Sequence, residues 1–169
     1  ITNVIPKHIE ALTSKLEEMG VKMEIGIDTI TVEHNDNLLP VDITTKPYPG
    51  FATDLQQPLT ALLTQIKGES RVVDTIYTER FKHCLELQRM GADIDIDKGS
   101  SIIKGPSKLY GDKVYATDLR CGACLVIAGL LAEGETEIHD IYHIDRGYYD
   151  IDEKIKKLGG DICREVVEK

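Results

Sequence analysis

Basic residues, long apolar runs and proline are all scarce in this chain of 169 residues. Its 20 lysines and arginines stand against 29 acidic residues, a net charge of −9, so no positive face for nucleic acid is expected. The longest apolar run, residues 124–132, falls far short of the roughly 20 residues that span a bilayer. Proline occurs 6 times and glycine is evenly spread, so a long disordered tail is not expected.

Regular disulfide spacing and a signal peptide are also missing. The four cysteines follow no repeating interval, and residues 1–15 lack the basic start and apolar middle of a signal sequence. A chain of this length with 41% hydrophobic content can bury a full core without covalent cross-links. We therefore expect one domain over residues 1–169, in the reduced cytoplasm, with no membrane and no nucleic-acid partner.

Internal repetition is the strongest pattern in the sequence. The segments "GESRVVDTIYTERF" (68–81) and "GETEIHDIYHIDRG" (134–147) align at a constant offset of 66, and the text before them agrees as well. Each unit predicts a helix, two alternating strands, a third strand, an apolar helix after Thr-Asp, and a strand ending at Glu-Arg or Asp-Arg. Alternating strands and helices in three such units predict an α/β domain with approximate three-fold symmetry.

Helix stops give the register of the three units. They are Met19-Gly20, Met90-Gly91 and Leu158-Gly159. The match of Gly20 to Gly91 also aligns Asn3 with Asp74, so the sequence starts partway through a unit, and with Ile1. The third unit stops after its first helix and strand. We expect the chain to be part of a longer protein.

One segment has the spacing of a zinc site, Cys121-x2-Cys124 followed by His139-x3-His143. The cysteines are expected on the first turns of a helix, and the histidines on and just after a strand. Four strand residues span about 13 Å, too far for two ligands with metal bonds of about 2 Å. A redox cysteine pair is a further alternative, because helix N-termini lower thiol pKa values. We favour small core cysteines and expect no metal and no cofactor.

Charged residues recur at equivalent element boundaries. Asp54 and Asp118 each stand in Thr-Asp-Leu before an apolar helix, where a plain N-cap would account for one of them. Arg80 and Arg146 each close a predicted strand. Arg120 stands in a first helical turn, where a cation opposes the helix dipole and so indicates an anionic partner. Equivalent ends of pseudo-symmetric units converge, so we predict an anion-binding rim with one or two carboxylates able to act as bases.

Four segments of the chain have the text of a known family: "PYPGFATDLQQPL" (47–59), "YTERFKHCLELQRMGADI" (77–94), "ATDLRCGACLVIAGLLAEG" (116–134) and "IYHIDRGYYDIDEKIKKLGGDI" (141–162). With them the chain resembles the UDP-N-acetylglucosamine enolpyruvyl transferases, within the enolpyruvyl transferase and EPSP synthase family. The resemblance implies an inside-out α/β barrel of pseudo-three-fold repeated units, here most of the C-terminal globule of a two-globule enzyme. It implies transfer of the enolpyruvyl group of phosphoenolpyruvate to the 3-hydroxyl of UDP-N-acetylglucosamine, with release of phosphate, in peptidoglycan precursor synthesis.

The resemblance also implies roles for single residues. Asp54 matches the carboxylate that holds the sugar 3-hydroxyl and is the favoured base, and Asp118 matches an acidic residue near the reacting centre. Ile76 matches a position that touches the UDP-sugar through its backbone. Arg80 and Arg120 match arginines that grip the carboxylate of phosphoenolpyruvate.

Arg146 matches the family arginine that closes over the phosphate. The family's proton-donating loop and much of its uridine site belong to the missing N-terminal globule, so the chain alone is expected to be inactive. The alternative is a non-catalytic domain that uses the same rim to bind an anion or a nucleotide-sugar.

Overall fold

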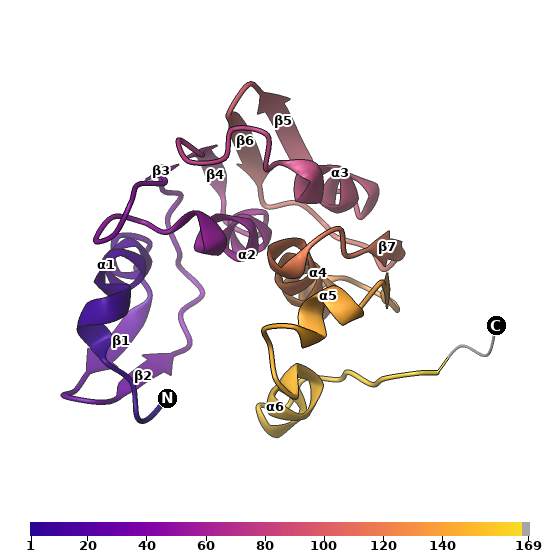
Figure 1. The fold of residues 1–169 in the computed structure, drawn as a ribbon. Helices are drawn as coiled ribbons and strands as arrows, with labels where there is room; N and C mark the ends of the chain where they lie inside the picture. The colour runs from indigo at the N-terminus through magenta and orange to yellow at the C-terminus, as the bar shows by residue number, and fades with distance from the viewer. Residues whose placement is uncertain (167–169) are drawn as a thin grey trace.

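Two units of one plan follow each other along the chain, and further helices lie after them (Figure 1). The computed structural model describes residues 1–166. The first unit comprises η1 (Pro6–Ile9), α1 (Glu10–Glu18), β1 (Lys22–Ile25), β2 (Ile30–Glu33), β3 (Ile43–Thr44), α2 (Thr53–Leu63) and β4 (Gly68–Val73). The second comprises α3 (Lys82–Arg89), β5 (Asp93–Asp97), β6 (Ser100–Gly105), β7 (Lys113–Tyr115), α4 (Leu119–Leu131) and β8 (Glu137–His139). After them come α5 (Tyr142–Asp145) and α6 (Ile151–Lys157).

The three predicted helix stops are confirmed. Gly20, Gly91 and Gly159 follow α1, α3 and α6 with φ values of +86°, +106° and +91°. This left-handed conformation suits glycine and ends a helix. At Gly91 a side chain would also collide, because a Cβ there would lie 2.8 Å from the carbonyl oxygen of Lys108.

The sheets repeat the plan and join the units. β1-β2 and β5-β6 are antiparallel hairpins, whereas β3-β4 and β7-β8 are parallel pairs. The parallel pair of the first unit meets the hairpin of the second in one four-stranded sheet, in the order β3-β4-β6-β5. The joint is antiparallel, with Val73 opposite Ser100.

α2 and α4 occupy the centre, and the sheets lie outside them. α2 and α4 contact each other in the middle of the arc that Figure 1 shows. Leu59 and Leu63 of α2 and Cys124 and Leu125 of α4 are buried in one apolar core, together with Ile103 of β6. Burial of such apolar surface is the main favourable term in folding. The arrangement agrees with the predicted inside-out α/β fold.

The last strand of the first unit ends earlier than predicted. β4 stops at Val73, and Arg80 lies beyond it in a turn. The buried side chain of Asp74 accepts hydrogen bonds from the backbone N–H groups of Ile76 (2.9 Å) and Tyr77 (2.8 Å). A side chain that takes up local N–H groups competes with the sheet ladder, so the strand gives way to a turn.

The matching strand of the second unit is also shorter than predicted. β8 ends at His139, and Asp140 then takes a φ of +57° and turns the chain into α5. Arg146 therefore follows a short helix instead of ending a strand. His143 lies on that helix, so the extended span assumed between the two histidines is wrong.

Cys121 and Cys124 lie on the first turns of α4, as predicted, and both are buried. Burial raises the pKa of both thiols, and it raises that of neighbouring Cys84 to about 12. Burial thus outweighs any help that the helix N-terminus gives to a thiolate. The cysteine pair has the surroundings of core residues and not those of a redox centre.

Neither a cluster of metal ligands nor a membrane-spanning helix occurs within residues 1–166. In that range, no three His, Cys, Asp or Glu side chains gather as ligands of a metal ion would. Nor does any helix in the same range have the length and apolar character needed to cross a membrane.

Candidate active site

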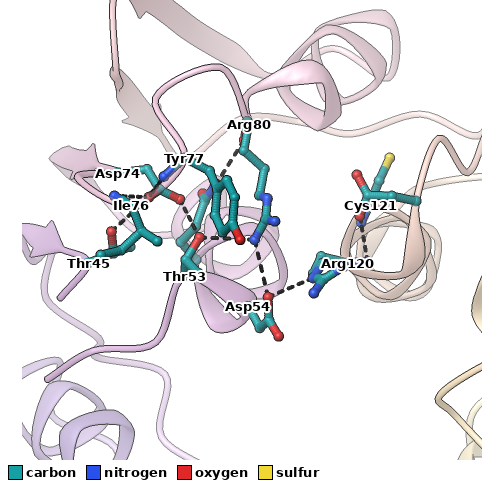
Figure 2. Close-up of polar contacts among 11 residues, drawn as sticks. Thr45, Thr53, Asp54, Asp74, Ile76, Tyr77, Arg80, Arg120 and Cys121 are labelled. Atoms are coloured by element: carbon teal, nitrogen blue, oxygen red, sulfur yellow. Dashed lines mark hydrogen bonds and ion pairs between the residues drawn. The ribbon is translucent and has the colours of Figure 1, made fainter. Parts of the chain in front are cut away.

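Three of the predicted residues meet where α2 and α4 begin (Figure 2). Asp54 Oδ1 accepts hydrogen bonds from Arg120 Nε at 2.7 Å and from Arg80 Nη1 at 3.2 Å. Asp54 lies in the first turn of α2 and Arg120 in the first turn of α4, whereas Arg80 comes from the turn between β4 and α3. Both units thus contribute to one charged cluster, in which Arg80 and Arg120 form what we call the arginine pair.

Asp54 is held as a carboxylate. The hydrogen bond from Arg120 has the largest effect and lowers its pKa, whereas burial, the next largest, raises it. The charges of Arg120 and Arg80 and the hydrogen bond from Arg80 lower the pKa further, so the net shift is downward. Because the side chain is 57% exposed, these ion pairs contribute little to stability. Two guanidinium groups facing one carboxylate leave local positive charge in a chain of net charge −9. The cluster can therefore attract an anion and also offers a group that accepts a proton.

Other side chains hold Arg80 in place. Its Nη1 also donates to Thr53 Oγ1 at 3.1 Å, and its guanidinium carbon lies 3.9 Å from the centre of the Tyr77 ring. Gln56 Nε2 donates to the backbone carbonyl of Arg80 at 3.0 Å. Stacking and hydrogen bonding orient a guanidinium for a planar partner such as a carboxylate. These three supporting residues were not predicted, although Thr53 stands in the repeated Thr-Asp-Leu.

Of the two aspartates, Asp118 is the one that acts as a plain N-cap, at the start of α4. Its Oδ1 accepts hydrogen bonds from the backbone N–H groups of Arg120 (2.8 Å) and Cys121 (3.2 Å). Asp54 has no such role, because α2 already begins at Thr53. The expectation that one aspartate is a cap is thus confirmed, and the cap fixes the backbone that carries Arg120.

Replacing Asp118 with alanine is expected to lower the free energy of unfolding by about 1 kcal/mol, because the helix loses its cap. Asparagine caps nearly as well, so Asp118→Asn is expected to keep most of the stability while removing the charge. Denaturant unfolding of both variants measures the difference. Equal losses in the two variants would contradict the capping role.

The remaining two predicted residues lie apart from the cluster. The N–H of Ile76 bonds to Asp74, and its side chain is half-exposed. Arg146 is exposed at the end of α5 and makes no ion pair with any residue in 1–166. Tyr148, two residues further on, is partly buried. Its pKa is raised, mainly by burial and to a lesser extent by the negative charge of Asp54. The segment of Arg146 therefore approaches the cluster, although its own side chain does not join it.

A hollow of about 330 Å³ lies beside Arg80. Tyr77, Lys82 and Asp118 line it, and so does Gln57, whose buried Oε1 has no hydrogen-bond partner in the described part of the chain. The hollow is mixed in charge and open to solvent. It provides space for a small polar molecule next to the arginine pair.

The chain matches a known family over most of its length. The family model for EPSP synthase (3-phosphoshikimate 1-carboxyvinyltransferase) matches residues 1–155, and the chain belongs to that family. Over 164 residues it is 58% identical to UDP-N-acetylglucosamine 1-carboxyvinyltransferase 2 of Listeria monocytogenes, covering 97% of this chain and 39% of the relative. The enzyme of the same name from Staphylococcus aureus (strain Mu50) is 55% identical over 167 residues, covering 99% and 40%. The chain thus spans about 40% of the length of these curated relatives.

Solved structures agree with the fold. The enolpyruvyl transferase NikO from Streptomyces tendae superposes with a TM-score of 0.83 at 30% identity, over 90% of this chain and 36% of that one. EPSP synthase from Acinetobacter baumannii has a TM-score of 0.59 at 20% identity, over 76% and 32%. The second likeness concerns the fold alone. Together the comparisons confirm the family resemblance that the sequence motifs indicate.

Proposed function

We propose that the full-length protein transfers the enolpyruvyl group of phosphoenolpyruvate to the 3-hydroxyl of UDP-N-acetylglucosamine and releases phosphate. The observation that carries the proposal is the carboxylate of Asp54 between Arg80 and Arg120. This cluster can accept a carboxylate, and it contains a base. The names of the relatives at 55% and 58% identity support this choice of substrates.

Substrate binding and base activation are coupled in this proposal. The carboxylate of phosphoenolpyruvate competes with Asp54 for the N–H groups of Arg80 and Arg120. Once displaced, Asp54 loses the hydrogen bonds that lower its pKa and becomes a stronger base beside the sugar hydroxyl. The backbone of Ile76 contacts the sugar, and Arg146 turns inward to bind the phosphate.

The reaction proceeds by addition and elimination. Asp54 takes the proton of the sugar 3-hydroxyl while the hydroxyl oxygen forms a bond to C2 of phosphoenolpyruvate. At the same time an acid supplied by the rest of the protein protonates the methylene carbon. Asp118 contributes by fixing the helix end that carries Arg120. A proton then leaves the new methyl group, the C2–O bond to phosphate breaks, and phosphate departs with the bonding electrons. Fixed guanidinium groups stabilise the charge that develops.

In the full-length protein, an N-terminal globule supplies the proton donor and much of the uridine site. The reaction takes place in the cytoplasm. No cofactor takes part. This chain alone, at about 40% of the relatives' length, is expected to have no transferase activity.

Phosphate release by the purified full-length protein tests the function. We expect release with phosphoenolpyruvate plus UDP-N-acetylglucosamine, and none above background with phosphoenolpyruvate plus shikimate 3-phosphate. Release only with shikimate 3-phosphate would reassign the substrate within the family. Binding of both proposed substrates without any release would favour the non-catalytic alternative.

A further inference from the structure

Asp74 is a buried carboxylate that lies behind the arginine pair. It is 1% exposed and ion-pairs with no cation in residues 1–166. A buried charge without a counter-ion is costly unless hydrogen bonds replace its hydration. Burial opposes the ionisation of Asp74, but hydrogen bonds outweigh it and its pKa lies below the usual value. A carboxylate that stays ionised although it is buried, and that lies close to the arginine pair, is a candidate for a functional role.

Four hydrogen bonds hold the Asp74 carboxylate, and they come from two sides (Figure 2). Oδ1 accepts from Thr45 Oγ1 at 2.9 Å and from the N–H groups of Ile76 and Tyr77. Oδ2 accepts from Thr53 Oγ1 at 2.6 Å. The three bonds to Oδ1 fix the turn after β4. The bond to Oδ2 comes from Thr53, which also contacts Arg80.

The Thr53 hydroxyl transmits the influence of Asp74 to Arg80. A hydroxyl has one proton, and that proton points to the ionised Asp74, which can only accept. The lone pairs of Thr53 Oγ1 therefore remain for Arg80 Nη1, which donates to it at 3.1 Å. A hydroxyl that donates to a charged acceptor is itself a better acceptor.

The turn provides a second connection to Arg80. The backbone N–H of Tyr77 donates a hydrogen bond to Asp74 and so fixes Tyr77 in place. The ring of Tyr77 lies 3.9 Å from the guanidinium carbon of Arg80. Asp74 thus supports Arg80 through a hydroxyl and through an aromatic ring. Both contacts restrict the plane of the guanidinium.

The second unit shows that the repeated fold does not require this arrangement. At the offset of 66, Asp140 is the counterpart of Asp74, yet it is exposed and its carboxylate accepts no hydrogen bond within the described chain. The unit around Asp140 still forms its parallel β7-β8 pair. The buried network is therefore particular to the side of the molecule that presents Arg80.

We propose that Asp74 and Thr53 are positioning residues for Arg80. They hold its guanidinium in the orientation in which it binds the carboxylate of phosphoenolpyruvate, and neither touches the substrate. The inference rests on the proposed function for the identity of that ligand.

The variant Thr53→Val in the full-length protein tests the inference, because valine keeps the shape and removes the hydroxyl. We expect the KM for phosphoenolpyruvate to rise about tenfold, the loss typical of one hydrogen bond to a charged group. The KM for UDP-N-acetylglucosamine and kcat should stay within about twofold, and Thr53→Ser should restore the KM for phosphoenolpyruvate. Asp74→Asn should raise the same KM and also lower the thermal midpoint.

Thr45→Val is the matched control. It also removes one hydrogen bond to Asp74, and with it the acceptor of the Thr75 N–H, on the far side of Asp74 from Arg80 (Figure 2). The Thr53 hydroxyl and the Tyr77 N–H still bond to Asp74 in this variant. We expect it to lower the thermal midpoint at least as much as Thr53→Val does, while the KM for phosphoenolpyruvate stays within about twofold of the wild type.

The outcomes separate the inference from the function on which it rests. Equal effects of Thr53→Val and Thr45→Val on that KM, or no effect of either, would overturn the positioning role while wild-type turnover upholds the function. If the wild type shows no turnover, calorimetric binding of phosphoenolpyruvate makes the same comparison. Weaker binding by Thr53→Val alone would then uphold the positioning role without the function, and equal binding by both variants would overturn it.

Discussion

Replacing Asp54 with asparagine in the full-length protein is expected to lower kcat by about a thousandfold, within the range for loss of a general base. Asparagine keeps the shape and can still accept a hydrogen bond from Arg120, whose Nε lies 2.7 Å from Asp54 Oδ1. It cannot take up the proton of the sugar hydroxyl. The KM for phosphoenolpyruvate is expected to stay the same or fall, because the arginine pair no longer faces an internal carboxylate. Steady-state phosphate release measures both constants.

Two further measurements check the role of Asp54. Its pKa is lowered in the free protein by Arg120 and Arg80, and phosphoenolpyruvate takes those partners away, so the pKa rises on binding. Activity is thus expected to fall as pH falls, and this acid limb should lie at higher pH for kcat than for kcat/KM. Asp36→Asn, at an exposed carboxylate bonded to His34, is the control and should change neither constant. A kcat for Asp54→Asn within tenfold of the wild type would place the base elsewhere.

The repeated fold could be predicted because its signals are local. A glycine that directly follows a helical pattern ends the helix by taking the left-handed conformation, and Gly20, Gly91 and Gly159 all do so. Strand ends were missed for the opposite reason. β4 stops at Val73 because Asp74 is buried and takes up the next N–H groups, and burial of one carboxylate is a property of the whole fold.

The candidate site was predictable as far as backbone position determines it. Asp54, Arg80 and Arg120 converge because equivalent ends of the two units lie together, as the repeat predicts. The supporting contacts of Tyr77 and Thr53 depend on side-chain directions, which repeated spacing does not contain.

The two Thr-Asp-Leu segments show how far a repeat can mislead. α2 begins at the threonine, Thr53, whereas α4 begins at the leucine, Leu119. The same tripeptide therefore places Asp54 within a helical turn, free to meet the arginine pair, and makes Asp118 a cap. A shift of two residues in the helix start separates a candidate base from a structural carboxylate.

Replacing Arg120 with alanine is expected to raise the KM for phosphoenolpyruvate about a hundredfold, the upper range for a lost charge-assisted hydrogen bond. Arg120 is the largest influence on the pKa of Asp54, so its removal also brings that pKa up toward the ordinary value. Arg120→Lys keeps the charge but loses the planar fork, and an intermediate KM is expected. The KM for UDP-N-acetylglucosamine should change little in either variant.

Arg71→Ala is the control for this loss of a cation. Arg71 is exposed on β4, and its replacement removes one positive charge without touching the cluster. If the field of the whole protein attracted phosphoenolpyruvate, Arg71→Ala and Arg120→Ala would raise the KM alike. A selective effect of Arg120→Ala would show that contact within the arginine pair binds the carboxylate. A rise in the KM for the UDP-sugar instead would assign Arg120 to the acceptor substrate and leave Arg80 as the carboxylate ligand.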